Sequence, residues 1–294
     1  MEIAQLALNA LVLGASYALV ALGFVLVLNA TAAVNFAHGD LVMAGGMLAA
    51  ALAAVLPLGE SLPGLFLLPM VMLGMAALGL LVSLLAYFPL RRGPPVSVFI
   101  STIAVAIILQ HGIKAAMGPA ERVAPPILSG EPVNLFGLSA GRQGLATLGV
   151  AALLIAGTAF LLRHTQFGKR LRASAQDPDM ARAIGVRVGV MIASSFALGT
   201  ALAGAAGLLF ANSYFVSPGS GGNLMIKAYI AVTIGGWGSV PGALAGALII
   251  AAFEVGVAAW ISSPVAEGAL YVALLLTLVM RPQGLFGEAT GRRA

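Results

Sequence analysis

Long runs of apolar residues alternate with short polar stretches along the whole chain. A bilayer core about 30 Å thick requires roughly 20 apolar residues in helical conformation. Eight runs are close to this length, and a ninth apolar piece is shorter. The predicted spans lie at 6–28, 40–58, 61–90, 96–113, 144–162, 189–211, 238–260 and 264–280, with the short element at 226–236. The pattern therefore predicts an all-α fold, a polytopic transmembrane helix bundle of eight to nine spans that forms one domain over residues 1–294.

Small side chains recur every four residues on several of these spans. The rows are Gly199, Ala203, Gly207 and Ala211; Gly238, Gly242 and Gly246; and Gly46, Ala50 and Ala54. Such rows let helix backbones approach closely in lipid, where packing replaces the hydrophobic drive. We interpret them as packing surfaces between helices.

Composition supports a membrane protein. The chain is 60% hydrophobic and 9% charged, whereas soluble globular proteins carry about 25% charged residues. The absence of cysteine excludes disulfides and thiolate metal sites. The sequence begins Met1-Glu2 without a basic segment, so we expect the first apolar run to remain as a helix and not to be cleaved as a signal peptide.

The basic residues predict how the spans are oriented. The net charge of +5 is concentrated in short loops, which indicates membrane orientation and not nucleic-acid binding. Arg91-Arg92, the segment 163–188 and the basic tail are expected on the cytoplasmic side. The N-terminus and a polar loop at about 117–143 are then outside and the C-terminus is cytoplasmic, provided that 226–236 counts as one crossing.

The segment from Phe167 to Val188 reads FGKRLRASAQDPDMARAIGVRV and is rich in basic residues. Asp177 can cap a helix, and Pro178 suits the first helical position. Gly185 can end that helix in a left-handed conformation. These signals predict a helix of two turns over 178–184.

A helix this short is not stable alone in water, so it is expected to dock on something. Met180 and Ile184 are four residues apart and share a face, which Ala181 and Ala183 flank. The alternative is a solvated loop that carries positive charge on the cytoplasmic side.

Four stretches resemble one family in the order in which that family has them. GKRLRASAQDPDMARAIGV, within 163–188, is similar to the cytoplasmic coupling loop of ABC importer permeases of the branched-chain amino-acid class. VNFAHGD at 34–40, IGGWGSVPGA at 234–243 and RPQGLFG at 281–287 resemble three further signatures of the same family. The resemblance covers about 8–287. Trp237 stands where many relatives have a smaller aromatic residue, which leaves the substrate open.

The resemblance implies a permease subunit in the bacterial inner membrane that forms half of a translocation pathway. Its partners would be a homologous second permease, two ABC ATPase subunits and an extracytoplasmic substrate-binding protein. This chain would bind no cofactor, and the ATPases would use ATP and Mg²⁺. Members of the family also transport urea, short amides and other small organic acids. The residues implied in ATPase coupling are Arg172, Gln176, Asp177, Pro178, Met180, Ala181, Arg182, Ile184 and Gly185.

The sequence contains no phosphate-binding G-x-x-x-x-G-K-[ST] loop, no H-E-x-x-H metal motif and no G-x-S-x-G elbow. We therefore expect that the chain is not an enzyme and that energy comes from a partner or an ion gradient. A channel would need a ring of carbonyls or like charges, and the sequence shows no charged ring.

Two polar, glycine-interrupted stretches, 34–46 and 234–242, break the apolar pattern in the two halves of the chain. Paired broken segments of this kind indicate the binding region of a transporter. The candidate pathway residues are Asn35, His38, Gly39, Gly235, Gly236 and Ser239. The alternative is local structure, in which Asn35 and Asp40 cap a helix and His38 stabilises a turn.

Glu254 lies inside a predicted span, and an intramembrane carboxylate is a functional candidate. A proton-coupled secondary transporter would use Glu254, His38 or His111 as its relay. The alternative is a structural ion pair between Glu254 and Lys227. Gln110 and His111 are predicted to lie at the membrane interface.

Overall fold

The computed structural model describes residues 2–56, 63–135, 138–281 and 283–286. Residues 57–62, between the second and third predicted spans, and Arg292 and Arg293 of the basic tail lie outside the described residues. The helices are α1 Glu2–Thr31, α2 His38–Val55, α3 Pro63–Val82, the π-helical turn η1 Ser83–Tyr87, α4 Pro95–Met117, α5 Arg142–His164, α6 Gln166–Gln176, α7 Pro178–Ala183, α8 Val188–Ser213, α9 Gly221–Gly235, α10 Val240–Trp260 and α11 Ser263–Met280.

Eight of these helices are long and apolar enough to cross a membrane, which confirms the predicted helical bundle. The polar loop at about 117–143 contains a small antiparallel hairpin, β1 Val133–Leu135 and β2 Leu138–Ala140, in which Val133 pairs with Ala140. The short apolar element is α9, with 15 residues. It begins five residues before the predicted 226, because the helix extends into a glycine-rich stretch that reads as a loop.

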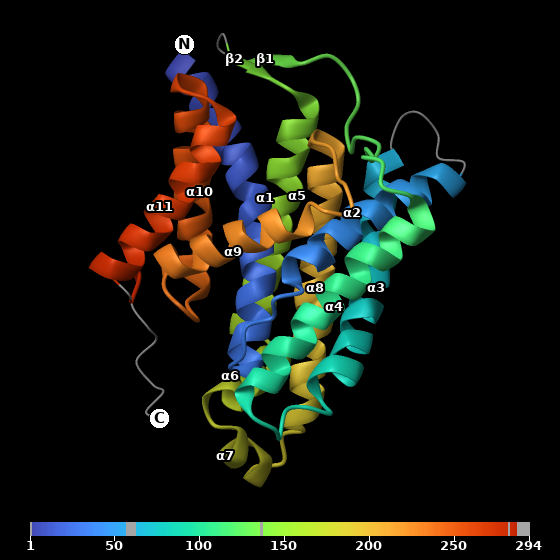
Figure 1. Cartoon of the computed structure of the whole chain (residues 1–294), viewed down its shortest axis with the longest axis vertical. Helices are drawn as coiled ribbons and strands as arrows, with labels where there is room; N and C mark the ends of the chain where they lie inside the picture. Colours follow the sequence, from blue (N-terminus) through green and yellow to red (C-terminus); the bar gives the residue numbers. More distant parts are fainter. Residues whose placement is uncertain (1, 57–62, 136–137, 282, 287–294) are drawn as a thin grey trace.

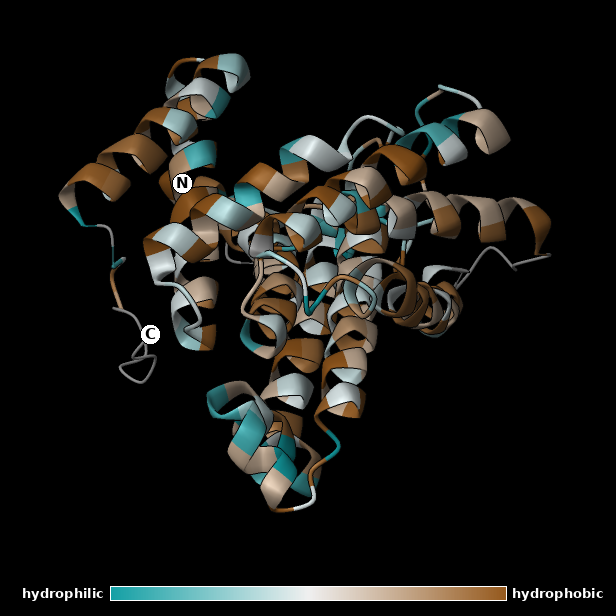
Figure 2. Cartoon of the chain, turned by 60° about the horizontal axis from the view of Figure 1, so that its bottom comes forward, coloured by the Kyte–Doolittle hydropathy of each residue, from teal (hydrophilic) through white to brown (hydrophobic). Residues whose placement is uncertain are grey.

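The two ends of the bundle differ (Figure 1). The hairpin end holds the N-terminus and β1–β2, and Gln5 of α1 donates a hydrogen bond to the Ser139 carbonyl there. The α7 end holds α6 and α7. Figure 2 shows hydrophilic residues gathered on α6 and α7, whereas most of the long helices are hydrophobic.

The segment that contains α9 carries the chain from one end of the bundle toward the other. Before α9, Val216 pairs with Arg122 in the loop that carries the hairpin. After α9, the Gly238 carbonyl accepts a hydrogen bond from Asn29 in the last turn of α1. The segment that contains α9 therefore runs between the two ends of the bundle although α9 itself is short.

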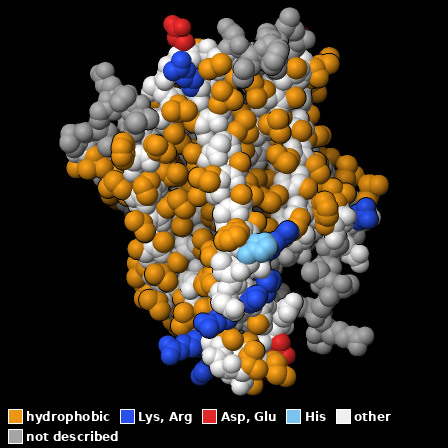
Figure 3. All heavy atoms as spheres, turned by 180° about the vertical axis from the view of Figure 1, so that it is seen from behind, with side chains coloured by type: hydrophobic (Ala, Val, Ile, Leu, Met, Phe, Trp, Pro, Cys, Tyr) orange, Lys and Arg blue, Asp and Glu red, His pale blue; other side chains and the backbone are white. Residues whose placement is uncertain are grey.

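The core of the bundle is formed by α1, α2 and α8, whose residues are mostly buried. By contrast, α4, α5 and α11 expose most of their length. Figure 3 shows one such exposed side covered by hydrophobic side chains, with lysine and arginine gathered toward the α7 end. Apolar faces of this kind contact lipid or another membrane chain.

Several of the predicted small residues lie at close contacts between helices, whereas Ala54 is exposed and Gly238, with a φ of 77°, lies before α10 and not within it. A Cβ added at Gly207 of α8 would stand 2.0 Å from the Val42 carbonyl oxygen of α2. A Cβ at Gly246 of α10 would stand 2.0 Å from the Ala231 carbonyl oxygen of α9. Both distances are far below van der Waals contact, so these positions require glycine.

Candidate functional site

The helix α7 forms as its sequence signals predict. The Asp177 side chain accepts hydrogen bonds from the amides of Asp179 and Met180, at 3.0 and 2.9 Å. Pro178 occupies the first position, and Gly185 has a φ of 84°. The helix ends at Ala183, one residue before the predicted end. Capping at both ends fixes a helix that is too short to persist without tertiary contacts.

The two apolar side chains of α7 point away from the protein. Met180 is 60% exposed and Ile184, just after the helix, is 69% exposed. Ala181 is 2% exposed and packs inward, so it anchors the helix and does not belong to the outward face. Arg182 forms an ion pair with Asp179 on the same helix. The outward face of α7 is thus apolar at its centre and charged beside it.

A second helix, α6, precedes α7 and was not predicted. The Thr165 hydroxyl caps it by accepting from the Gly168 amide at 3.1 Å. Gly168 fits closely against α5, since a Cβ there would stand 2.1 Å from the Leu162 carbonyl oxygen. Arg172 donates to that same carbonyl, so its side chain holds α6 to α5. Gln176 is exposed at the end of α6. The sequence signal that could have revealed this helix is Thr165 as its cap, followed by the apolar Leu171, which the structure shows to be buried.

The chain is broken between α1 and α2, at membrane depth. His38, the first residue of α2, lies beside Val20 of α1. Val20 is eleven residues before the end of α1, which corresponds to about 16 Å along the helix at a rise of about 1.5 Å per residue. The non-helical residues 32–37 therefore run back into the bundle. Irregular backbone at this depth is tolerated only against protein or water.

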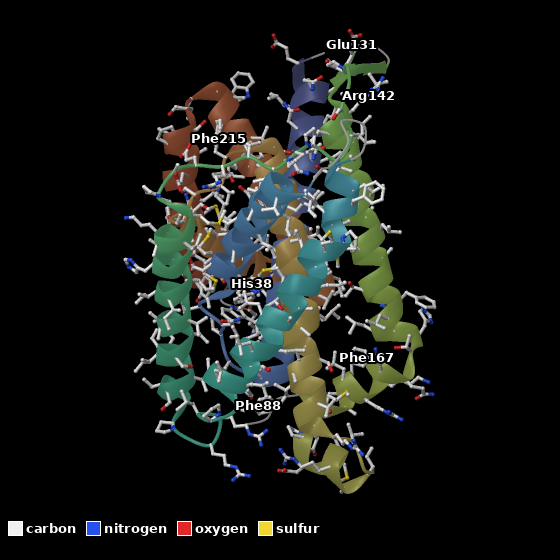
Figure 4. The ribbon with its side chains drawn as sticks, turned by 90° about the vertical axis from the view of Figure 1, so that its right-hand side faces the viewer. His38, Phe88, Glu131, Arg142, Phe167 and Phe215 are labelled. Atoms are coloured by element: carbon white, nitrogen blue, oxygen red, sulfur yellow. The ribbon has the colours of Figure 1, made fainter. Side chains whose placement is uncertain are left out.

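Asn35 and His38 are both buried at this break, and Figure 4 shows His38 in the middle of the bundle. The Asn35 side-chain oxygen accepts from the Ala37 amide at 3.1 Å. The His38 Nε2 atom lies 3.0 Å from the Val20 carbonyl oxygen and donates to it, because a carbonyl only accepts. Within the described residues, Asn35 Nδ2 and His38 Nδ1 have no hydrogen-bond partner. Each residue therefore combines a local structural bond with one free polar atom.

The later glycine-rich stretch joins α9 to α10. Gly236 has a φ of 111°, which favours glycine, and Ser239 caps α10 by accepting from the Gly242 amide at 3.1 Å. A Cβ at Gly235 would stand 2.0 Å from the Gly242 carbonyl oxygen. These three candidates thus have structural roles in a tight junction.

The C-terminal signature packs on the same junction. The amides of Leu285 and Phe286 donate to the carbonyls of Ile234 and Gly235, at 2.7 and 3.1 Å. These are carbonyls of the last turn of α9, which have no partner within the helix. Two of the four family-like stretches therefore meet in space.

The structure does not gather the six pathway candidates into one site. Gly39 lies against the first turn of α9, where an added Cβ would stand 2.1 Å from the Gly221 carbonyl oxygen. Gly235 and Gly236 are at the other end of that helix, about 20 Å away at 1.5 Å per residue. Only Asn35 and His38 present free polar atoms at the break.

Three ionisable side chains inside the bundle, Tyr17, Lys227 and Glu254, form one group. Lys227 Nζ lies 2.6 Å from Glu254 Oε1, which confirms the predicted pair. Lys227 also donates to the Tyr17 hydroxyl at 2.7 Å, and Tyr17 donates to Glu254 Oε2 at 2.8 Å. Sequence reasoning missed Tyr17, since only tertiary packing brings α1 to this pair. The group links α1, α9 and α10.

Gln110 faces a neighbouring helix, a contact that was not predicted from the sequence. It is partly buried and donates to the Asp40 carboxylate at 2.8 Å. Asp40 is 2% exposed, and the Gln110 amide stabilises a carboxylate that would otherwise be buried without a partner. His111, by contrast, is exposed.

Residues 6–280 match the family model described as "Branched-chain amino acid transport system / permease component". The chain is 30% identical to the permease protein BraD of a high-affinity branched-chain amino acid transport system from Pseudomonas aeruginosa, over 97% of this chain and 95% of that protein. It is 29% identical to the corresponding LivH of Escherichia coli K12, over 95% and 94% of the two chains. A probable LivH of Methanocaldococcus jannaschii is 30% identical over 92% and 88%.

Proposed function

The chain belongs to the family of permease components of branched-chain amino acid transport systems, and from this premise we propose that it forms half of the pathway of an ATP-driven importer for branched-chain amino acids. It is a multi-pass membrane protein with eight helices long enough to span a bilayer in its described part. The agreement with relatives along nearly their whole length supports the proposal. Importers of the same family for urea, short amides or other small organic acids are the second candidate.

The outward face of α7 is the observation that carries the coupling part of the proposal. Met180 and Ile184 expose apolar surface on a capped helix at the tip of the protein. A short amphipathic helix of this kind fits a groove on a partner, where its apolar side chains become buried. We assign that groove to an ABC ATPase subunit, which binds the ATP and Mg²⁺.

In this arrangement α7 transmits motion to the bundle. Ala181 packs inward, and α6 is held to α5 by the bond from Arg172 to Leu162. A displacement of α7 by closure of the ATPases would therefore move α6 and the start of α8 together. The α7 end is then cytoplasmic, the hairpin end faces the binding protein, and the exposed apolar faces of α4, α5 or α11 meet the homologous second permease.

The first experiment tests which energy source drives uptake and which substrate is transported. We expect reconstituted importer in proteoliposomes to take up labelled leucine when ATP is enclosed, and to continue in the presence of a protonophore. Excess isoleucine or valine should compete, whereas urea and acetamide should not. Uptake that stops with the protonophore would instead support the proton-coupled alternative, and competition by urea alone would move the chain to the second candidate.

The break at Asn35 and His38 is where we place substrate contact in this half of the pathway. Replacing Asn35 with alanine removes a free amide donor, and a hydrogen bond to a charged group contributes about 1.5–3 kcal/mol. We expect the concentration for half-maximal leucine uptake to rise roughly tenfold or more on this basis. His38→Ala should have a similar effect, combined with some loss of stability because its bond to Val20 is lost.

The matched control is Ser195→Ala. Ser195 is also fully buried and polar, but its hydroxyl donates to the Met191 carbonyl of its own helix. This variant should transport normally. Unchanged uptake by Asn35→Ala and His38→Ala at normal expression would remove both residues from the pathway.

A further inference from the structure

A cavity of about 450 Å³ opens at the α7 end of the protein. The last turn of α1, the turn after η1 and the segment from α6 to α8 surround it. Three arginines line it: Arg91, Arg92 and Arg182. Its volume lies in the range of about 300–1,000 Å³ that is usual for small-molecule sites. Pro178 and Arg182 are among the residues implied in ATPase coupling, whereas the transport mechanism proposed above uses none of the other lining side chains.

Two of the three arginines retain their positive charge without a carboxylate partner. Arg182 is neutralised by its ion pair with Asp179. Within the described residues, Arg91 and Arg92 form no ion pair. The Arg91 guanidinium lies 4.9 Å from the centre of the Phe88 ring, a residue that Figure 4 places toward the α7 end. This contact holds one cationic group beside the cavity.

Two uncharged features also favour an anion. Ser174 lines the cavity and is 4% exposed, and within the described residues its hydroxyl has no hydrogen-bond partner. The N-terminus of α8 lies in the same wall, at Val188 and Gly189, and no side chain caps it. The amides of Val188, Val190 and Met191 donate to backbone carbonyls, so this helix end contributes mainly the partial positive charge of its dipole.

The end of α1 opposes an anion, because Ala30 and Thr31 bring the carbonyl end of that helix to the cavity. A helix end is equivalent to about half an elementary charge. Two unpaired arginines and the positive end of α8 outweigh it. The balance of charge in the cavity is therefore positive.

We propose that this cavity binds a phosphate group, and that the phosphate belongs to an anionic phospholipid of the cytoplasmic leaflet. Arg91 and Arg92 would contact the phosphate oxygens, and the Ser174 hydroxyl would donate to one of them after rotation about its side-chain bond. Basic pockets between membrane helices on the cytoplasmic side bind lipid headgroups in this way.

The depth of the cavity favours a lipid over a soluble anion. Tyr87, which lines it, ends the third span, and Val188 begins the span formed by α8. The cavity therefore lies where the hydrocarbon region gives way to the headgroups. Ile192 and Ala30 supply an apolar wall that suits the glycerol and the start of an acyl chain.

Lipid binding by the purified importer tests this inference without any measurement of uptake. The complex in a neutral detergent would be titrated with phosphatidylglycerol, with phosphatidylcholine or with inorganic phosphate alone. Bound lipid would be counted by native mass spectrometry, and the unfolding temperature would be recorded. The variants are Arg91→Gln with Arg92→Gln, and separately Ser174→Ala, which keeps the charge. The control, Arg163→Gln with Arg170→Gln, removes the same charge from exposed positions outside the cavity.

We expect phosphatidylglycerol, but not phosphatidylcholine, to bind and stabilise the wild type. Half-saturation should shift at least tenfold in the double variant and by a smaller factor in Ser174→Ala, with the control unchanged. Stabilisation by inorganic phosphate alone, lost in the same variants, would support the phosphate site and identify a soluble source. Equal losses in the control, or no selectivity for phosphatidylglycerol, would overturn the proposal whether or not the importer transports leucine.

Discussion

Replacing Met180 and Ile184 with aspartate is expected to separate the chain from its ATPase subunits and to abolish ATP-driven uptake. Both side chains are more than half exposed on α7, so the change costs the isolated chain little stability. In the groove of the ATPase subunit, the two introduced aspartate carboxylates would be buried without partners. Central interface residues often cost 2 kcal/mol or more when truncated, so the double change should weaken docking by roughly a thousandfold or more.

The measurement is co-purification through a tag on the ATPase, followed by uptake in proteoliposomes. Met180→Leu with Ile184→Leu is the matched control, because it keeps the apolar face and should retain the ATPase. A second variant, Asp177→Ala, removes the cap and loosens α7 without adding charge; it should weaken docking partly. If the aspartate variant still copurifies and transports, α7 is not the docking element.

Removing one charge of the group formed by Tyr17, Lys227 and Glu254 should have the largest effect on stability. Glu254→Leu leaves the Lys227 ammonium partly buried with only the Tyr17 hydroxyl as a partner. Breaking a buried ion pair from one side costs about 3–5 kcal/mol. We expect a lower unfolding temperature and a much lower yield of assembled importer.

The double variant Lys227→Leu with Glu254→Leu separates a structural pair from a proton relay. Replacing both charges with apolar groups is often neutral, so the double variant should recover most of the stability and the uptake. Glu121→Leu, an exposed carboxylate in the external loop, is the control and should behave as the wild type. A stable double variant that cannot transport would show that the Lys227–Glu254 pair takes part in the transport cycle and is more than structural.

The spans could be predicted because each depends on a local property, the length of an apolar run. The prediction of α7 rests on equally local signals, since Asp177 and Gly185 mark its two ends within nine residues. By contrast, α6 was hidden because its basic residues read as a solvated loop, although Gly168 and Leu171 bury one side of it.

Apart from the pair of Lys227 with Glu254, the contacts between distant segments could not be predicted from the sequence. Nothing near Gln110 indicates that it lies against Asp40, and nothing near Tyr17 indicates the pair it joins. The two glycine-rich stretches were both expected near the translocation pathway, because both interrupt spans. The structure places them toward opposite ends of α9, and most of their glycines serve close backbone contact.

The hydrogen bonds from Leu285 and Phe286 to the end of α9 bear on the order in which the protein is made. The amides that bind the carbonyls of Ile234 and Gly235 belong to residues that are synthesised some fifty positions later. Until then the two carbonyls at the end of α9 lack these donors, and water or the insertion machinery must supply hydrogen bonds in their place. A nascent chain that stops before Leu285 already contains the eight spans of the described part but lacks both amide donors, so this junction forms only after the last of those spans has been made.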